Sequence, residues 1–166
     1  MLTLRPFQFL ARALVADGTP RQLALGFAFG VLIGLVPKGN LIAVALMVLF
    51  FAVRVNLGIG MLTAFVFSWI GMLLDPLSHR LGLFLLTHPT LQSLWVQLYN
   101  MRFAPWTDFN NTVVLGSFLI GSSLFLPCYV LSRPILERYV SSWLVKLQQF
   151  RLVRLIWGLN VASKLS

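Results

Sequence analysis

The sequence predicts an all-α integral membrane protein, and three observations support this fold class. The chain of 166 residues is 58% hydrophobic and only 10% charged, with a mean hydropathy of +0.87, which is more apolar surface than a soluble domain of this length can bury. Turn-forming proline, glycine and asparagine residues separate the apolar runs. Most of the 13 basic residues lie towards the two ends of the chain, where basic segments typically mark the cytoplasmic side of a membrane.

The first segment, residues 1–17, is predicted to form an amphipathic helix in the membrane interface. Its apolar residues recur at helical spacing, at Leu4, Phe7, Leu10, Ala11 and Leu14. Polar and charged residues interrupt the segment throughout. Because a signal peptide has a continuous apolar stretch, no cleavage is expected here.

The next two apolar runs, residues 23–36 and 41–53, are predicted to form a hairpin of short helices. Thr19, Pro20 and Gln22 have the pattern of a capping box with proline at the first helical position. Neither run reaches the roughly 20 residues of a spanning helix. The pair is therefore interpreted as a re-entrant hairpin, which enters and leaves the membrane by the same face. The alternative is two thin spanning helices.

Two later runs, residues 57–74 and 112–131, are long and apolar enough to span a membrane. After the first of them, Asp75-Pro76 resembles the start of a new, shorter helix that ends near Leu86. Residues 90–111 have the aromatic and amide content of a membrane–water boundary.

The chain after the second spanning run is predicted to form a basic amphipathic helix in the membrane plane. From Pro134 to about Leu159, apolar residues recur at three- and four-residue steps, with basic residues between them. We therefore divide the chain into an interfacial helix, a membrane domain and a C-terminal basic helix, over residues 1–17, 18–132 and 133–166.

Charge predicts the orientation, with both termini in the cytoplasm. Each terminal region carries several basic residues, whereas the predicted outer segment between the two spanning runs carries only Arg80 and Arg102. If the hairpin were two spanning helices instead, two crossings would be added and the orientation would stay the same.

Residues 18–85 resemble a known bacterial membrane family. The residues that carry the resemblance are Gly18-Thr19-Pro20, Ala24, Gly26, Gly30, Gly34, Pro37, Gly39 and Arg54-Val55-Asn56. They are similar to the domain-of-unknown-function family two-zero-six-two, and the rest of the chain resembles a longer subgroup with an extra spanning helix and a basic tail. The resemblance implies a bacterial inner membrane and work on the envelope or its lipids, but no reaction.

The turn at Lys38, Gly39 and Asn40 is the first candidate binding site. The free N–H groups of the second hairpin helix would face this turn, and together with the lysine they suit an anion or a lipid head group. The structural alternative is that glycine makes the turn, asparagine caps the helix and lysine reaches to head groups.

Other polar residues near the apolar runs are further candidates. Arg54 and Asn56 follow the hairpin and are candidates for the same head-group contact, or serve as an anchor and a helix cap. Asp75, His79 and Arg80 are intramembrane ionisable candidates, because the carboxylate can pair with either cation one turn later.

Glycines are predicted to provide helix-packing faces. Gly26, Gly30 and Gly34 recur every four residues and expose one backbone stripe. Gly116 and Gly121 are expected to form a matching patch on the last spanning helix.

Enzyme signatures are missing from the sequence, so we expect neither catalytic residues nor a cofactor. The two histidines, His79 and His88, lack the spacing of zinc ligands, and Cys128 is the only cysteine. The four carboxylates form no close pair, and a membrane chain with terminal basic segments is not expected to bind nucleic acid.

The sequence therefore favours a small, non-enzymatic inner-membrane subunit. Its expected partners are phospholipids together with a second copy or, as the resemblance implies, a larger envelope protein in lipid or lipid-linked sugar transport. The alternative is a small oligomeric channel or transporter whose polar path is lined by Lys38, Arg54 and Asp75.

Overall fold

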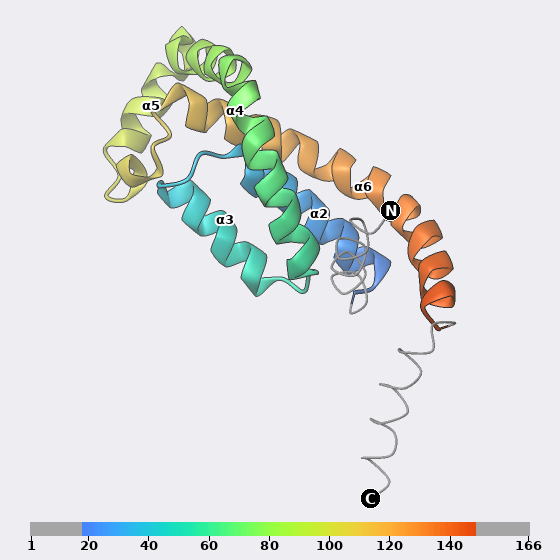
Figure 1. The fold of residues 1–166 in the computed structure, drawn as a ribbon. Coiled ribbons are helices and arrows are strands. Elements are labelled where there is room, and N and C mark those ends of the chain that lie inside the picture. The colour runs from blue at the N-terminus through green and yellow to red at the C-terminus, as the bar shows by residue number, and fades with distance from the viewer. Residues whose placement is uncertain (1–17, 149–166) are drawn as a thin grey trace, which may run out of the picture.

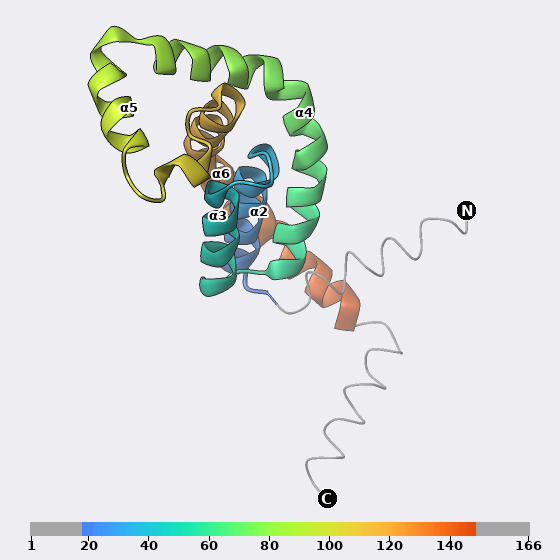
Figure 2. The same cartoon turned by 90° about the vertical axis from the view of Figure 1, so that its left-hand side faces the viewer.

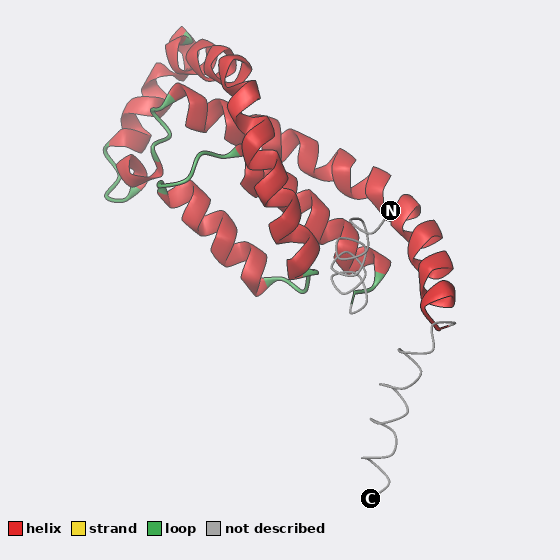
Figure 3. Ribbon diagram, in the orientation of Figure 1, coloured by secondary structure: helices red, strands yellow, loops and turns green. Residues whose placement is uncertain are grey.

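The structure is a computed structural model that describes residues 18–148, and in this range it contains helices and no strands (Figure 3). In chain order the elements are α2 (Pro20–Leu35), α3 (Leu41–Ala52), α4 (Leu57–Thr87), η1 (Pro89–Leu91), α5 (Gln92–Tyr99), η2 (Ala104–Thr107) and α6 (Thr112–Gln148). The predicted all-α class is therefore confirmed for the described part of the chain. The predicted interfacial helix over residues 1–17 lies outside it.

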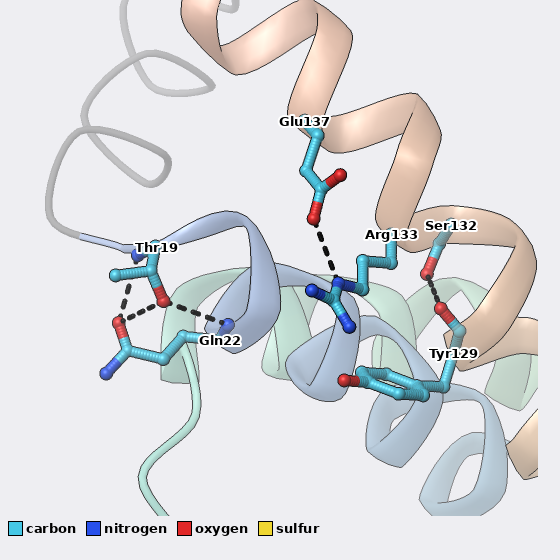
Figure 4. A network of polar contacts seen from close by, with 6 residues as sticks. All are labelled: Thr19, Gln22, Tyr129, Ser132, Arg133 and Glu137. Carbon is cyan, nitrogen blue, oxygen red and sulfur yellow. Dashed lines mark hydrogen bonds and ion pairs between the residues drawn. The ribbon is translucent and has the colours of Figure 1, made fainter.

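Side-chain caps begin the first three helices. Thr19 and Gln22 form the predicted capping box at the start of α2 (Figure 4). Asn40 accepts a hydrogen bond from the backbone N–H of Ala43, and Asn56 does the same for α4. Since free N–H groups at a helix start need acceptors, these caps define where the helices begin.

Helix α2 is the centre of the fold. It packs against both α4 and α6, which also contact each other (Figure 1). Most of its residues are buried, including the fully buried Leu23 and Val31. Helices α4 and α6 are thus arranged around one buried apolar helix.

Helix α3 returns alongside α2 and closes the hairpin. An apolar cluster joins the two helices. Phe29, Leu32 and Ile33 of α2 and its C-cap residue Val36 pack with Ala43, Leu46 and Phe50 of α3. After α3, the backbone N–H of Asn56 donates to the carbonyl oxygen of Gln22, at 3.0 Å. The exit of the hairpin therefore lies beside its entrance.

Helix α4 runs in the same direction as α2 and then bends. Gly26, Gly30 and Gly34 of α2 face successive residues of α4 from Asn56 to Phe67. Figure 2 shows the second half of α4 turned across the top of the other helices. Pro76 lies inside the helix, and a proline removes one backbone hydrogen bond and commonly kinks a helix.

The prediction that Asp75 caps a new helix is wrong. Asp75 lies within α4, which continues for 31 residues to Thr87. A proline that follows a short polar residue has the sequence pattern of a helix start. Here the helix continues through the proline with a kink. The backbone hydrogen bonds of the helix on either side of Pro76 can still form.

Helix α6 also crosses its prolines without ending. It extends from Thr112 to Gln148, with Pro127 and Pro134 inside, so no helix boundary occurs near residue 132. The predicted start of a separate helix at Pro134 is wrong for the same reason as at Asp75. The predicted basic helix beyond residue 148 lies outside the described range.

Within residues 18–148, two helices are long and apolar enough to cross a membrane. They are Leu57–Thr87 and Thr112–Arg138, whereas Pro20–Leu35 and Leu41–Ala52 are apolar but shorter. This agrees with the two spanning helices and the two short hairpin helices expected from the sequence.

Candidate functional site

The turn between α2 and α3 is built around the Lys38 ammonium group. Its Nζ donates to the backbone carbonyl oxygens of Ile33, Gly34 and Val36, at 2.7, 3.0 and 2.9 Å. It also lies 3.2 Å from the hydroxyl oxygen of Ser68 on α4. The three protons of the Lys38 ammonium group thus have four oxygen acceptors. The lysine residue as a whole is nevertheless exposed.

These contacts place a positive charge at the negative end of a helix. The last carbonyl groups of α2 have no partners within the helix, and a cation there is favoured by the helix dipole. The four oxygens are acceptors that the sequence did not indicate for Lys38. Neither Asp75 nor any other carboxylate is among them.

Asn40 and Gly39 close the turn. Asn40 is buried, its Nδ2 donates to the carbonyl oxygen of Pro37 at 2.8 Å, and its Oδ1 caps α3. Gly39 has a φ of 102°, a conformation that favours glycine. Both polar groups of the Asn40 side chain are therefore satisfied by neighbouring backbone groups.

The contact with Ser68 shows which part of α4 lies beside the α2–α3 turn. The Ser68 hydroxyl donates to the carbonyl oxygen of Ala64 at 2.7 Å while facing Lys38. Eleven residues separate it from Leu57 at the start of α4, which is about 17 Å at 1.5 Å per residue. This contact could not be predicted from the sequence, because a serine inside an apolar run is common and Ser68 lies 30 positions from Lys38.

The other ionisable candidates lie away from Lys38, at different positions along the hairpin and α4. Arg54 is exposed in the linker at the opposite end of the hairpin, and Asp75 lies beyond Ser68, before the bend of α4. His79 Nδ1 is 2.6 Å from the Thr112 hydroxyl on α6. The structure therefore does not bring these groups together with Lys38.

The pairing expected between Asp75 and a cation one turn later is also not found. Among the side chains of residues 18–138, the ion pair observed joins Arg133 and Glu137 on α6 (Figure 4). His79 instead contacts Thr112, and Arg80 is exposed.

The glycine stripe of α2 faces α4. A side chain at Gly30 would overlap the carbonyl oxygen of Gly60, and one at Gly26 would overlap that of Asn56. Of the two α6 glycines expected to match it, Gly121 lies against Leu32 of α2, whereas Gly116 lies against Ser78 of α4. The sequence did not single out Gly60, which lies in an apolar run.

A shallow cleft beside α5 was not expected from the sequence. It has a volume of about 250 Å³ and is lined by Leu86, Trp95, Val96, Tyr99, Asn100, Phe109 and Asn110. Trp95 stacks on Phe109, with ring centroids 5.9 Å apart. In the described residues, no group of three or more histidine, cysteine or acidic side chains is placed to hold a metal ion.

Comparison with known proteins gives a family but no activity. Residues 4–143 match the family described as "Uncharacterized protein conserved in bacteria (DUF2062)". An uncharacterized protein of Treponema pallidum (strain Nichols) is 30% identical over 136 residues, which are 82% of this chain and 84% of the relative. No solved structure matches. The resemblance seen in residues 18–85 is therefore confirmed over a longer part of the chain.

Proposed function

Because the chain belongs to this family of uncharacterized bacterial proteins (DUF2062), we propose that it is a non-enzymatic subunit of the bacterial inner membrane. The first half of α4 and most of α6 cross the bilayer, and both termini lie in the cytoplasm. The α2–α3 hairpin enters from the cytoplasmic side and returns to it. The subunit binds phospholipid and assembles with a second copy or a larger envelope protein.

The contact between Lys38 and Ser68 carries this proposal. If α4 enters the hydrocarbon layer near Leu57, the turn lies about 17 Å deep in a core of about 30 Å. The hydrogen bond between Asn56 and Gln22 keeps the two ends of the hairpin together at the entry side. A lysine at this depth needs acceptors, and the helix carbonyls supply them.

The exposed apolar surface supports insertion in a bilayer. Many large side chains of α3 and α4 are exposed, among them Val48, Phe51, Phe65, Trp69 and Leu73. A soluble monomer rarely exposes so much continuous apolar surface. Lipid chains or a partner helix therefore cover these faces.

A subunit is favoured over the channel alternative by the positions of the charges. Lys38 is directed at carbonyl groups, Arg54 lies at the other end of the hairpin, and Asp75 lies above the turn. A polar path would need these groups along one continuous surface. Lipid-linked sugars remain one class of lipid that the assembled subunit would contact.

The proposal is tested by purifying the tagged full-length chain from bacterial membranes in mild detergent. Native mass spectrometry should detect bound phospholipid together with a second copy or one stoichiometric envelope protein. A bare monomer without lipid would overturn the proposal.

Reconstitution in liposomes separates the subunit from the channel. We expect no ion flux above that of empty liposomes. Flux that is lost in Arg54→Gln and Asp75→Asn, but kept in the control Arg80→Gln, would support the channel instead.

A further inference from the structure

The segment between the two long helices exposes several large apolar side chains. We name Leu94, Val96, Tyr99, Met101, Phe103 and Trp106 the outer aromatic surface. Phe103 is 69% exposed and Trp106 is 74% exposed. Their neighbour Arg102 is also exposed, so apolar rings and a cation occur together on this segment.

The segment is held in place by its other side. Trp95 stacks on Phe109, Tyr99 meets Phe109 edge to face, and the Trp95 indole N–H donates to the carbonyl oxygen of Leu85 at 2.9 Å. Phe109 is buried, and the hydrogen bond from Trp95 joins the segment to α4. The segment that carries the outer aromatic surface therefore has a defined position in the fold.

The two helices that flank the segment, α4 and α6, contact each other where the segment begins and ends. The second half of α4 lies against the start of α6, where Gly82 faces Thr112 and Gly116 faces Ser78. Between these ends, η2 comes back to contact α3. The segment that carries the outer aromatic surface therefore lies beside α3 of the hairpin (Figure 2).

We propose that the outer aromatic surface is seated in the interface of the outer leaflet, with phospholipid as its occupant. Trp106 and Phe103 lie among the acyl chains of the outer leaflet just below the head groups, because η2 meets α3 no farther out than the hairpin turn. Arg102 reaches the phosphate groups, as flanking cations do. This inference rests on the proposed membrane position of α4 and the hairpin.

Single-tryptophan variants test the inference. One variant keeps Trp106 and the other keeps Trp69, with every other tryptophan replaced by phenylalanine. Trp69 is exposed on α4 next to Ser68 and therefore reports on the bilayer centre. Each full chain is reconstituted in vesicles of phosphatidylethanolamine and phosphatidylglycerol, with bromine placed near either end of the acyl chains.

We expect Trp106 to lose more fluorescence with bromine near the carbonyl end, and Trp69 to lose more with bromine near the methyl end. If Trp69 is quenched by lipid while aqueous iodide quenches Trp106, the inference is overturned and the proposed function stands. If lipid quenches neither, the proposed function fails as well. If Trp106 is shielded from both quenchers, a protein covers the surface, and the lipid assignment is wrong.

A second variant tests the inference independently, in case the tryptophan replacements prevent folding. Phe103→Cys in a Cys128→Ser chain keeps all tryptophans and accepts a spin label. The label should be more accessible to oxygen, which concentrates in the bilayer, than to a water-soluble nickel complex. The opposite order of accessibility would contradict the inference.

Discussion

Lys38 stabilises the hairpin as the C-terminal cap of α2. Its three contacts with backbone carbonyls satisfy groups that would otherwise lack donors at the end of the helix. In a bilayer no water is available to replace the lysine, so the cost of removing it is greater than in a soluble helix.

Replacing Lys38 with methionine is expected to destabilise the protein by about 1–3 kcal/mol, the range for buried polar groups left unsatisfied. The measurement is unfolding in mixed detergent micelles, followed by circular dichroism. Arg54→Met is the matched control, because it removes an exposed cation from the other end of the hairpin. Equal stability of the two variants would contradict the capping role.

Gly82 allows α4 and α6 to approach closely. A methyl group there would overlap the carbonyl oxygen of Thr112, whereas one at Gly71 would lie 3.3 Å from that of Leu35. Alanine favours a helix over glycine by about 1 kcal/mol, but the overlap should reverse the sign.

We therefore expect Gly82→Ala to lose about 1–3 kcal/mol of stability, as overpacked cores do. Gly71→Ala, the same change in the same helix, should have little effect. Unfolding in the same micelles measures both, and a stabilised Gly82→Ala would mean that the two helices are not packed as described.

At the scale of elements, the proposed membrane position requires that α4 both crosses the bilayer and lies along its surface, and the bend in α4 makes this possible. A straight helix of 31 residues would measure about 46 Å, which exceeds a hydrocarbon core of about 30 Å. The part before Pro76 has spanning length. The part after it lies across the other helices and meets the start of α6 (Figure 2).

Pro76→Ala should straighten α4, because it restores the N–H group that the helix lacks. Spin labels on cysteines at Met61 and Phe84, both exposed, should then lie farther apart than in the chain with proline. Double electron–electron resonance in a Cys128→Ser background gives this distance. An unchanged distance would show that packing, and not the proline, determines the bend.

Local sequence signals predicted the starts of α2, α3 and α4, but not the contacts that these helices make with distant residues. Thr19, Asn40 and Asn56 cap helices where polar residues precede apolar runs, because a cap is formed by residues close in sequence. The Lys38–Ser68 and Gly82–Thr112 contacts join positions about 30 residues apart. Such contacts depend on how α4 packs and bends, which periodicity does not specify.

At the scale of the whole molecule, basic terminal segments and an outer segment with few cations favour cytoplasmic termini. Reporter fusions at each end measure this directly. Alkaline phosphatase, which is active only in the periplasm, should be inactive at both ends, and a fluorescent protein that folds in the cytoplasm should be bright. Phosphatase activity at either end would contradict the topology.

The membrane position of the hairpin turn separates a re-entrant hairpin from two thin spanning helices. The first half of α4 runs beside α2 and passes the turn before it ends. The turn should therefore stop short of the outer surface. Two thin spanning helices would instead expose the turn to the periplasm.

Cysteine accessibility at the start of α3 tests the re-entrant hairpin most directly. Leu41 is partly exposed beside the turn, and it avoids the strain that a side chain would meet at Gly39, where φ is 102°. In a Cys128→Ser chain, Leu41→Cys should resist a bulky impermeant thiol reagent added to intact spheroplasts. Thr90→Cys, exposed in η1, should react. Rapid labelling of Leu41→Cys from the periplasmic side would mean that both short helices span the membrane, and the re-entrant hairpin would be wrong.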